Sequence, residues 1–312
     1  MAAAPPVEND LKRTHRIAAL LTLLPLTSFA ALEVVIVEGL GGDVRYEEQF
    51  SNQVDALRRA ALSLTEAGRI RVFRSDEASR EAVLAHFDAL GEKLNSDDRL
   101  AVFLVGHGSF DDHQYKFNVK GPDLTDEDLV QVLDALDGPS QLVVNTSSAS
   151  GAIAELLRKD GRTLILATRS GAERHATRFG NYFTAALTDA SADTDKNGIV
   201  TAEEAFRFAS RQVEDYFERN GQLATEHARL EGAQAGRFSL ARLGAVRPVR
   251  DDAVLRRLLA AREQLNADID ALRLRRDDMA ADAYQQALLE NMLELATLED
   301  AIEAREAELD DE

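Results

Sequence analysis

Short apolar runs, separated by segments of helical length, organise the first 230 residues of this chain. Five of these runs predict strands, at residues 32–37, 70–73, 100–105, 141–144 and 163–167. Between the first two runs, Val54, Leu57, Ala61 and Leu64 recur at helical spacing. Strands that alternate with helices in this order form a mostly parallel sheet with helices on both faces. The pattern therefore predicts an α/β domain over residues 31–230.

Small and polar residues follow two of the predicted strands directly. The run 100–105 ends in Gly106-His107-Gly108-Ser109, and the run 141–144 ends in a polar turn that contains Ser147 and Ser148. In an open α/β sheet, ligands bind beyond the carboxyl ends of the strands. We therefore expect His107 and the two serines to face one crevice.

Composition narrows the chemistry that such a crevice can perform. The chain has no cysteine, which excludes a thiolate nucleophile, disulfides and thiolate metal sites. Its net charge of −19 argues against nucleic-acid binding, because phosphates are neutralised by lysine and arginine. An apolar fraction of 45% is ample for a folded core.

The order His-Gly turn, hairpin, helix, strand and small-residue turn resembles the legumain and caspase clan of cysteine peptidases. That clan places its catalytic His in a His-Gly turn and its catalytic Cys after the next strand. Residues 146–151 align with the turn that carries the Cys, and Ser148 stands at its position. The resemblance covers residues 32–217. It implies a caspase-like fold with His107 and Ser148 at the catalytic positions and the Gly108 backbone in an oxyanion hole.

The resemblance also assigns residues to a substrate pocket, and these depart from the family pattern. Arg45 and Glu47 stand in the first loop, where legumain has an Asn that assists the His and an Arg of the specificity pocket. Thr146 and Ser170 are the other expected pocket residues. The polar stretch 168–175 that contains Ser170 is either part of this pocket or an ordinary solvated loop.

Three functions are compatible with these residues. The first is a pseudoprotease that binds a peptide or protein without cleaving it, because a serine hydroxyl is a poorer nucleophile than a thiolate. The second is a serine hydrolase with Ser148 as nucleophile, or Ser147 if the alignment shifts by one residue, and His107 as base. The third is a scaffold that acts through the carboxyl-terminal region.

Residues 193–204 match the EF-hand calcium loop. Asp193, Asp195 and Asn197 supply side-chain oxygens, Gly198 makes the sharp turn, and the expected remaining ligands are the Ile199 carbonyl, Thr201 and Glu204. Hard Ca²⁺ prefers such a set of oxygens. The alternative is an Asp-rich loop that caps a helix without a metal. A single loop of this kind is expected to have a structural role.

The two ends of the chain differ in character from the domain between them. Residues 1–30 have a basic segment, a short apolar run and Ser28-Phe29-Ala30, which predicts a signal peptide and a periplasmic or secreted protein. The alternatives are an uncleaved anchor or a buried helix. After cleavage no membrane span is expected.

Beyond residue 230, we expect a linker at 231–250 and then an α-helical arm. Residues 251–312 contain no Gly or Pro, and leucines recur there at seven-residue spacing. This predicts a helical hairpin or coiled coil, or one long helix, that serves self-association or protein docking. Packing of a hairpin on its own domain is the other reading.

Overall fold

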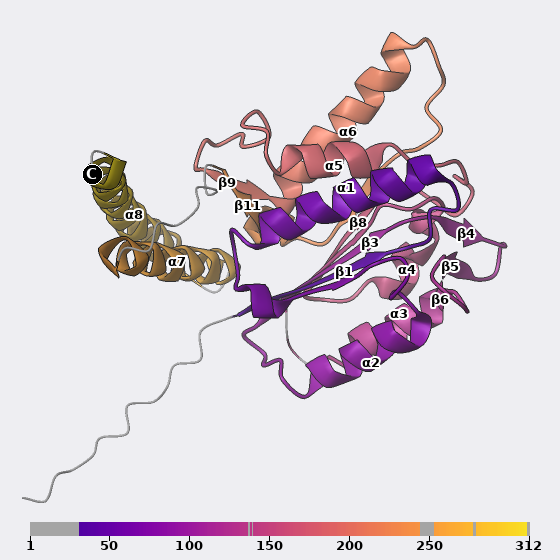
Figure 1. The fold of residues 1–312 in the computed structure, drawn as a ribbon, viewed down its shortest axis with the longest axis horizontal. Helices are drawn as coiled ribbons and strands as arrows, with labels where there is room; N and C mark the ends of the chain where they lie inside the picture. The colour runs from indigo at the N-terminus through magenta and orange to yellow at the C-terminus, as the bar shows by residue number, and fades with distance from the viewer. Residues whose placement is uncertain (1–30, 137, 139, 244–252, 277–278, 311–312) are drawn as a thin grey trace, which may run out of the picture.

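The computed structural model describes residues 31–136, 138, 140–243, 253–276 and 279–310. A six-stranded sheet lies at its centre (Figure 1). In spatial order its strands are β10 (Arg229–Glu231), β8 (Arg162–Leu166), β7 (Ser140–Asn145), β3 (Arg99–Val105), β1 (Leu32–Glu38) and β2 (Ile70–Phe73). All are parallel except β10, which pairs antiparallel with β8. The mixed α/β architecture with a mostly parallel sheet is confirmed.

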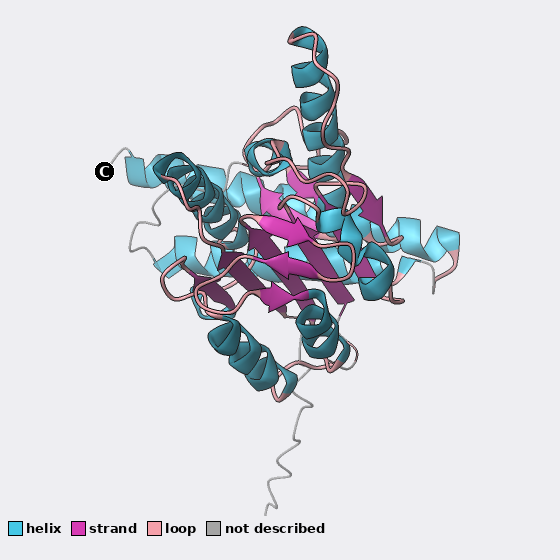
Figure 2. Ribbon diagram, turned by 90° about the vertical axis from the view of Figure 1, so that its right-hand side faces the viewer, coloured by secondary structure: helices cyan, strands magenta, loops and turns pink. Residues whose placement is uncertain are grey.

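Helices cover both faces of this sheet, because successive apolar side chains of a strand point to opposite faces and pack into two separate cores. Val34 and Ile36 of β1 face one core, and Val35 and Val37 face the other. The first face is covered by α1 (Val44–Ala61), α5 (Phe179–Ala186) and α6 (Ala202–Arg219) (Figures 1 and 2). The second face is covered by α2 (Arg80–Gly91), α3 (Asp126–Asp134) and α4 (Ala154–Leu157).

Two small sheets complete the domain. The strands β4 (Gly108–Phe110), β5 (Tyr115–Phe117) and β6 (Leu124–Thr125) form an antiparallel sheet directly after the His107 turn. A second, two-stranded sheet pairs β9 (Ile199–Thr201) with β11 (Ser239–Arg242). Short 3-10 helices occupy Ala67–Arg69 (η1), Ser150–Ile153 (η2) and Ala235–Arg237 (η3).

Cap residues and backbone angles set where the helices begin. The helix α1 begins at Val44, because the Asp43 side chain accepts a hydrogen bond from the Arg45 amide, so Arg45 and Glu47 lie on a helix rather than in the predicted loop. Ser79 caps α2 by accepting the Ala82 amide. After the serine turn, Ala149 adopts a left-handed φ of 56°, and the helical segment that follows is divided into η2 and α4.

The linker predicted at residues 231–250 is wrong as far as Arg242. That part of the chain ends β10 and contains η3 and β11, and the Phe238 side chain is completely buried. Its glycines serve tight turns between short strands. Gly232 has a φ of 98°, and a Cβ there would stand 2.7 Å from the Arg162 carbonyl oxygen. Residues 244–250 lie outside the described part.

The carboxyl-terminal region forms two helices, α7 (Ala253–Leu274) and α8 (Ala281–Asp310), which lie side by side (Figure 1). Among the expected alternatives, a helical pair is present and one continuous helix is not. Arg262 of α7 and Glu299 of α8 form an ion pair at 3.6 Å. In the described ranges, no helix has the length and apolarity needed to cross a membrane. The predicted signal peptide, residues 1–30, lies outside those ranges.

Candidate functional site

The strand β3 delivers His107 to the carboxyl edge of the sheet, where α1 also begins. The imidazole packs edge-on against Tyr46 and Phe50 of α1, with ring centroids 4.6 and 5.0 Å away. Burial lowers the pKa of His107, and this outweighs a hydrogen bond with the Gly41 backbone that raises it. His107 is therefore neutral at pH 7 and half-buried against two aromatic rings.

The neighbouring strand β7 delivers the serine turn, and there Ser147 is tied into a buried network. Its hydroxyl lies 2.6 Å from the Tyr115 hydroxyl, which also accepts a hydrogen bond from the Asn145 amide at 2.9 Å. Asn145 Oδ1 in turn accepts the Ser147 backbone N–H. Burial raises the pKa of Tyr115 to about 12, so this phenol stays protonated. The network holds Ser147 as a structural residue.

Gly108 brings the His107 turn and the serine turn into contact. A Cβ on Gly108 would stand 2.5 Å from Ser147 Oγ, 2.6 Å from the Ser148 carbonyl oxygen and 2.7 Å from the Tyr115 hydroxyl. The two turns thus meet at one edge of the sheet. The His107 ring and the Ser148 hydroxyl, which both lie in the described part of the chain, do not form a hydrogen bond with each other. Ser148 is only 5% exposed.

The expected pocket residues are not gathered in one place. Thr146 is buried, and its hydroxyl donates to the Leu104 carbonyl oxygen at 3.1 Å, so this side chain serves the sheet. Arg45 and Glu47 are exposed on α1, and Arg45 pairs with Asp43. Ser170 is exposed and accepts a hydrogen bond from the Ala172 amide within the loop 168–175.

A polar hollow of about 360 Å³ lies between α1 and α5. Arg45, Asn52, Gln53 and Asn181 are among its lining residues, and the Gln53 amide donates to Asn181 Oδ1 at 2.7 Å. Neither His107 nor the serine turn lines it. The hollow is therefore separate from the edge at which the two turns meet.

Sequence reasoning missed residues that support the serine turn from a distance. Glu173 accepts the Ala149 backbone N–H on its own carbonyl at 2.8 Å, and its side chain lies 2.6 Å from His227 Nδ1. Tyr115 reaches Ser147 across 32 positions of sequence. Tyr115 stands between the polar residues Gln114 and Lys116, and this alternation is the available signal that its hydroxyl points inward and needs a partner.

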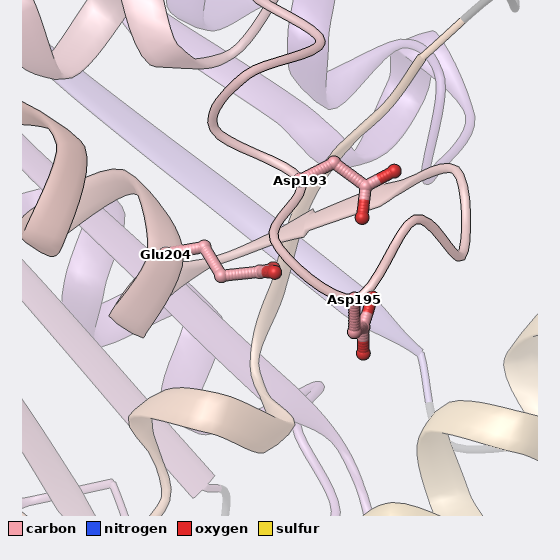
Figure 3. Close-up of side chains that lie close together, drawn as sticks. All are labelled: Asp193, Asp195 and Glu204. Carbon is pink, nitrogen blue, oxygen red and sulfur yellow. The ribbon is translucent and has the colours of Figure 1, made fainter.

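The acidic loop at residues 193–204 brings three carboxylates together (Figure 3). One oxygen each from Asp193, Asp195 and Glu204 lies within 4.8 Å of the others, which is compatible with a shared metal ion. Asp193 and Glu204 are 8% exposed, and Asp195 is exposed. The structure thus supports a metal-binding triad, and three of the six predicted ligands form it.

Backbone hydrogen bonds fold the loop around these carboxylates. Asp193 accepts the amides of Asn197 and Gly198 at 3.1 and 2.8 Å, and Gly198 has a φ of 78°, which glycine adopts readily. Asn197 Oδ1 accepts the Ile199 amide at 2.8 Å. The Thr201 hydroxyl caps α6 by accepting the Glu204 amide. These short-range bonds hold the carboxylates in place, and the Leu243 amide, which donates to the Gly198 carbonyl at 2.8 Å, ties the loop to the end of β11.

The charges of the triad oppose one another. Burial raises the pKa of Asp195, and the nearby negative charges of Glu204 and Asp193 raise it further. Burial also acts to raise the pKa of Glu204, but hydrogen bonds from Thr201 and Thr194 outweigh it and leave that pKa lowered. A cation between these groups would relieve the repulsion.

No family model matches the chain, and the search of curated proteins gave no match. A crystal structure of protein GSU0716 from Geobacter sulfurreducens is similar to it, with a TM-score of 0.45 and 13% sequence identity. That alignment covers 69% of this chain and 98% of the other.

Proposed function

We propose that this chain is a caspase-like pseudoprotease that binds a peptide or protein at the edge shared by the His107 and serine turns. One observation carries the proposal: Gly108 joins the two turns, yet His107 makes no hydrogen bond with Ser148, both being in the described part of the chain. The small sheet between His107 and α3 stands where the resemblance implies a hairpin, which supports the proposal.

The chemistry of this edge favours binding over hydrolysis. A serine nucleophile needs a base within hydrogen-bond reach, because its hydroxyl is scarcely ionised near neutral pH. His107 instead packs its ring on Tyr46 and Phe50, and Ser147 shares its hydroxyl with Tyr115. Neutral His107 and the exposed polar side chains of α1 remain available to hydrogen-bond an extended peptide.

We also propose that the triad of Asp193, Asp195 and Glu204 binds calcium. A set of carboxylate and other oxygens on one loop suits Ca²⁺ better than Mg²⁺, which requires stricter octahedral geometry. The remaining predicted ligands are the Asn197 side chain, the Ile199 carbonyl and Thr201, directly or through water. Bound calcium would join the segment before β9 to α6, which packs on the sheet. In the proposed periplasmic or extracellular location, abundant calcium would keep even a weak site filled.

Hydrolysis of a mixed peptide pool by the purified protein tests the proposal. We expect no cleavage by the wild type, with or without calcium, and new activity in a Ser148→Cys variant that is lost again in Ser148→Cys with His107→Ala. Ser150→Cys is the matched control, since Ser150 is completely buried and bonded to Thr168. Cleavage by the wild type that disappears in Ser148→Ala would establish a serine peptidase instead.

A further inference from the structure

The helix α8 carries an apolar surface that the rest of the described chain leaves open. Leu289 and Leu293 are 60% and 61% exposed, and they lie one turn apart on the same face. Leu288 and Met292, in the adjacent row, are only half-buried. We call these four residues the α8 strip. Contiguous exposed apolar side chains of this kind mark interaction surfaces more often than single exposed leucines do.

The contact with α7 accounts for one face of α8 and leaves Leu289 and Leu293 exposed. Leu265 and Ile269 of α7 and Ile302 of α8 are buried, and Arg262 pairs with Glu299. A pair of helices buries one seam, while residues beside that seam stay open until a further helix covers them. The strip therefore has room for one more helix.

Charge indicates what kind of helix fits there. The α8 sequence has nine acidic residues and a single arginine, and two of those acids, Glu290 and Glu294, directly follow the strip leucines. The α7 sequence, with four arginines and three acidic residues, is nearly balanced. A second α8 would bring like charges together, which disfavours self-association through this surface. A basic partner would be attracted.

We infer that α8 docks an amphipathic helix of a partner protein, with apolar residues three and four positions apart and lysine or arginine on both flanks. Leu289 and Leu293 supply the apolar contact, and Glu290 and Glu294 pair with the flanking cations. This mode of recognition lays an apolar helix face into an apolar surface and uses charge for orientation. It needs neither the serine turn nor the acidic loop.

Binding of two synthetic helical peptides to the full chain tests this inference. Both carry the same number of lysines, but one has a leucine stripe and the other has serine at those positions. We expect the leucine peptide to bind to the wild type. The double variant Leu289→Gln with Leu293→Gln should bind this peptide with at least tenfold lower affinity. The control Leu223→Gln, at a residue 92% exposed elsewhere, leaves binding unchanged. Glu290→Gln with Glu294→Gln weakens binding and its dependence on salt.

Two results would overturn the inference. Equal binding of the two peptides, or affinity unaffected by the leucine substitutions, would mean that the acidic protein attracts any cation. Concentration-dependent dimerisation that the leucine substitutions abolish would mean that a second copy occupies the strip. Ser148→Cys serves as an independent control, because it changes the proposed peptide-binding edge and leaves α8 intact.

Discussion

The acidic loop and the His107 edge are assembled from very different lengths of chain. Every predicted ligand of the loop lies within residues 193–204, and the side-chain hydrogen bonds among them span at most the ten positions from Thr194 to Glu204. At the edge, Tyr115 bonds Ser147 across 32 positions, and His107 packs on Tyr46 from another element. Local contacts therefore gather the carboxylates of the loop, whereas the edge exists only when the sheet has formed.

The two regions also differ in whether their polar and charged side chains have partners. Ser147, Tyr115 and Asn145 form a neutral network in which each hydroxyl has a partner. The loop concentrates three carboxylates, and burial, together with the nearby negative charges of Glu204 and Asp193, raises the pKa of Asp195. A complete neutral network favours rigidity, and an excess of negative charge favours a cation. The edge is thus expected to respond to packing changes and the loop to metal.

Adding one methyl group at Gly108 should have the largest effect on the edge. The Cβ of Gly108→Ala would stand 2.6 Å from the Ser148 carbonyl oxygen, so backbone must move. We expect a loss of about 3 kcal/mol in the free energy of unfolding, measured by urea denaturation. Gly68→Ala is the control, since a Cβ there meets no atom within 4 Å. Equal stability of the two variants would mean that the two turns are not in contact.

Calcium should have nearly as large an effect, confined to the loop. At a free concentration one hundred times the dissociation constant, a ligand that binds only the folded state adds about 2.7 kcal/mol to the free energy of unfolding. We expect this gain in the wild type, its loss on chelation, and its absence in Glu204→Gln. Glu203→Gln, next to it and paired with Arg207, should keep the gain. A gain that survives in Glu204→Gln would place the metal elsewhere.

Removing one hydroxyl from the edge should lower the free energy of unfolding by less than the two preceding changes do. Ser147→Ala leaves the buried Tyr115 hydroxyl without an acceptor, and we expect a loss of about 1.5 kcal/mol in the free energy of unfolding. Ser148→Ala should cost under about 0.5 kcal/mol, because no hydrogen bond of the Ser148 hydroxyl occurs in the described ranges. The opposite ranking of the two variants in thermal denaturation would assign the structural role to Ser148.

The same contrast of distances explains what could be predicted from sequence. Thr125 and Asp128 form a reciprocal cap at the start of α3, and such a cap can be recognised in a sequence because it depends on residues three positions apart. The strand β11 has only four residues, too few for an apolar pattern, so the sequence predicts a linker over its segment. Glu173 and Tyr115 support the serine turn through contacts that only the folded sheet brings together.

The smallest expected effect concerns the ionisation of His107, which reports how closely its ring is covered. Burial against Tyr46 and Phe50 lowers the pKa of His107 below its ordinary value, so the folded state binds this proton less readily than the unfolded state. Its contribution to stability is complete above about pH 6.5 and is lost as the pH falls toward the lowered pKa.

The imidazole NMR signal of His107 can be assigned because it is absent in His107→Gln. Titration of this signal should show a midpoint below that of free histidine. Phe50→Leu should move the midpoint up toward the ordinary value, because water gains access to the ring. Phe208→Leu is the control, since Phe208 packs in the same core without an aromatic contact to His107. A midpoint that both substitutions shift equally would attribute the lowered pKa to the core as a whole. A shift in Phe50→Leu alone would show that α1 sets the protonation state of the edge.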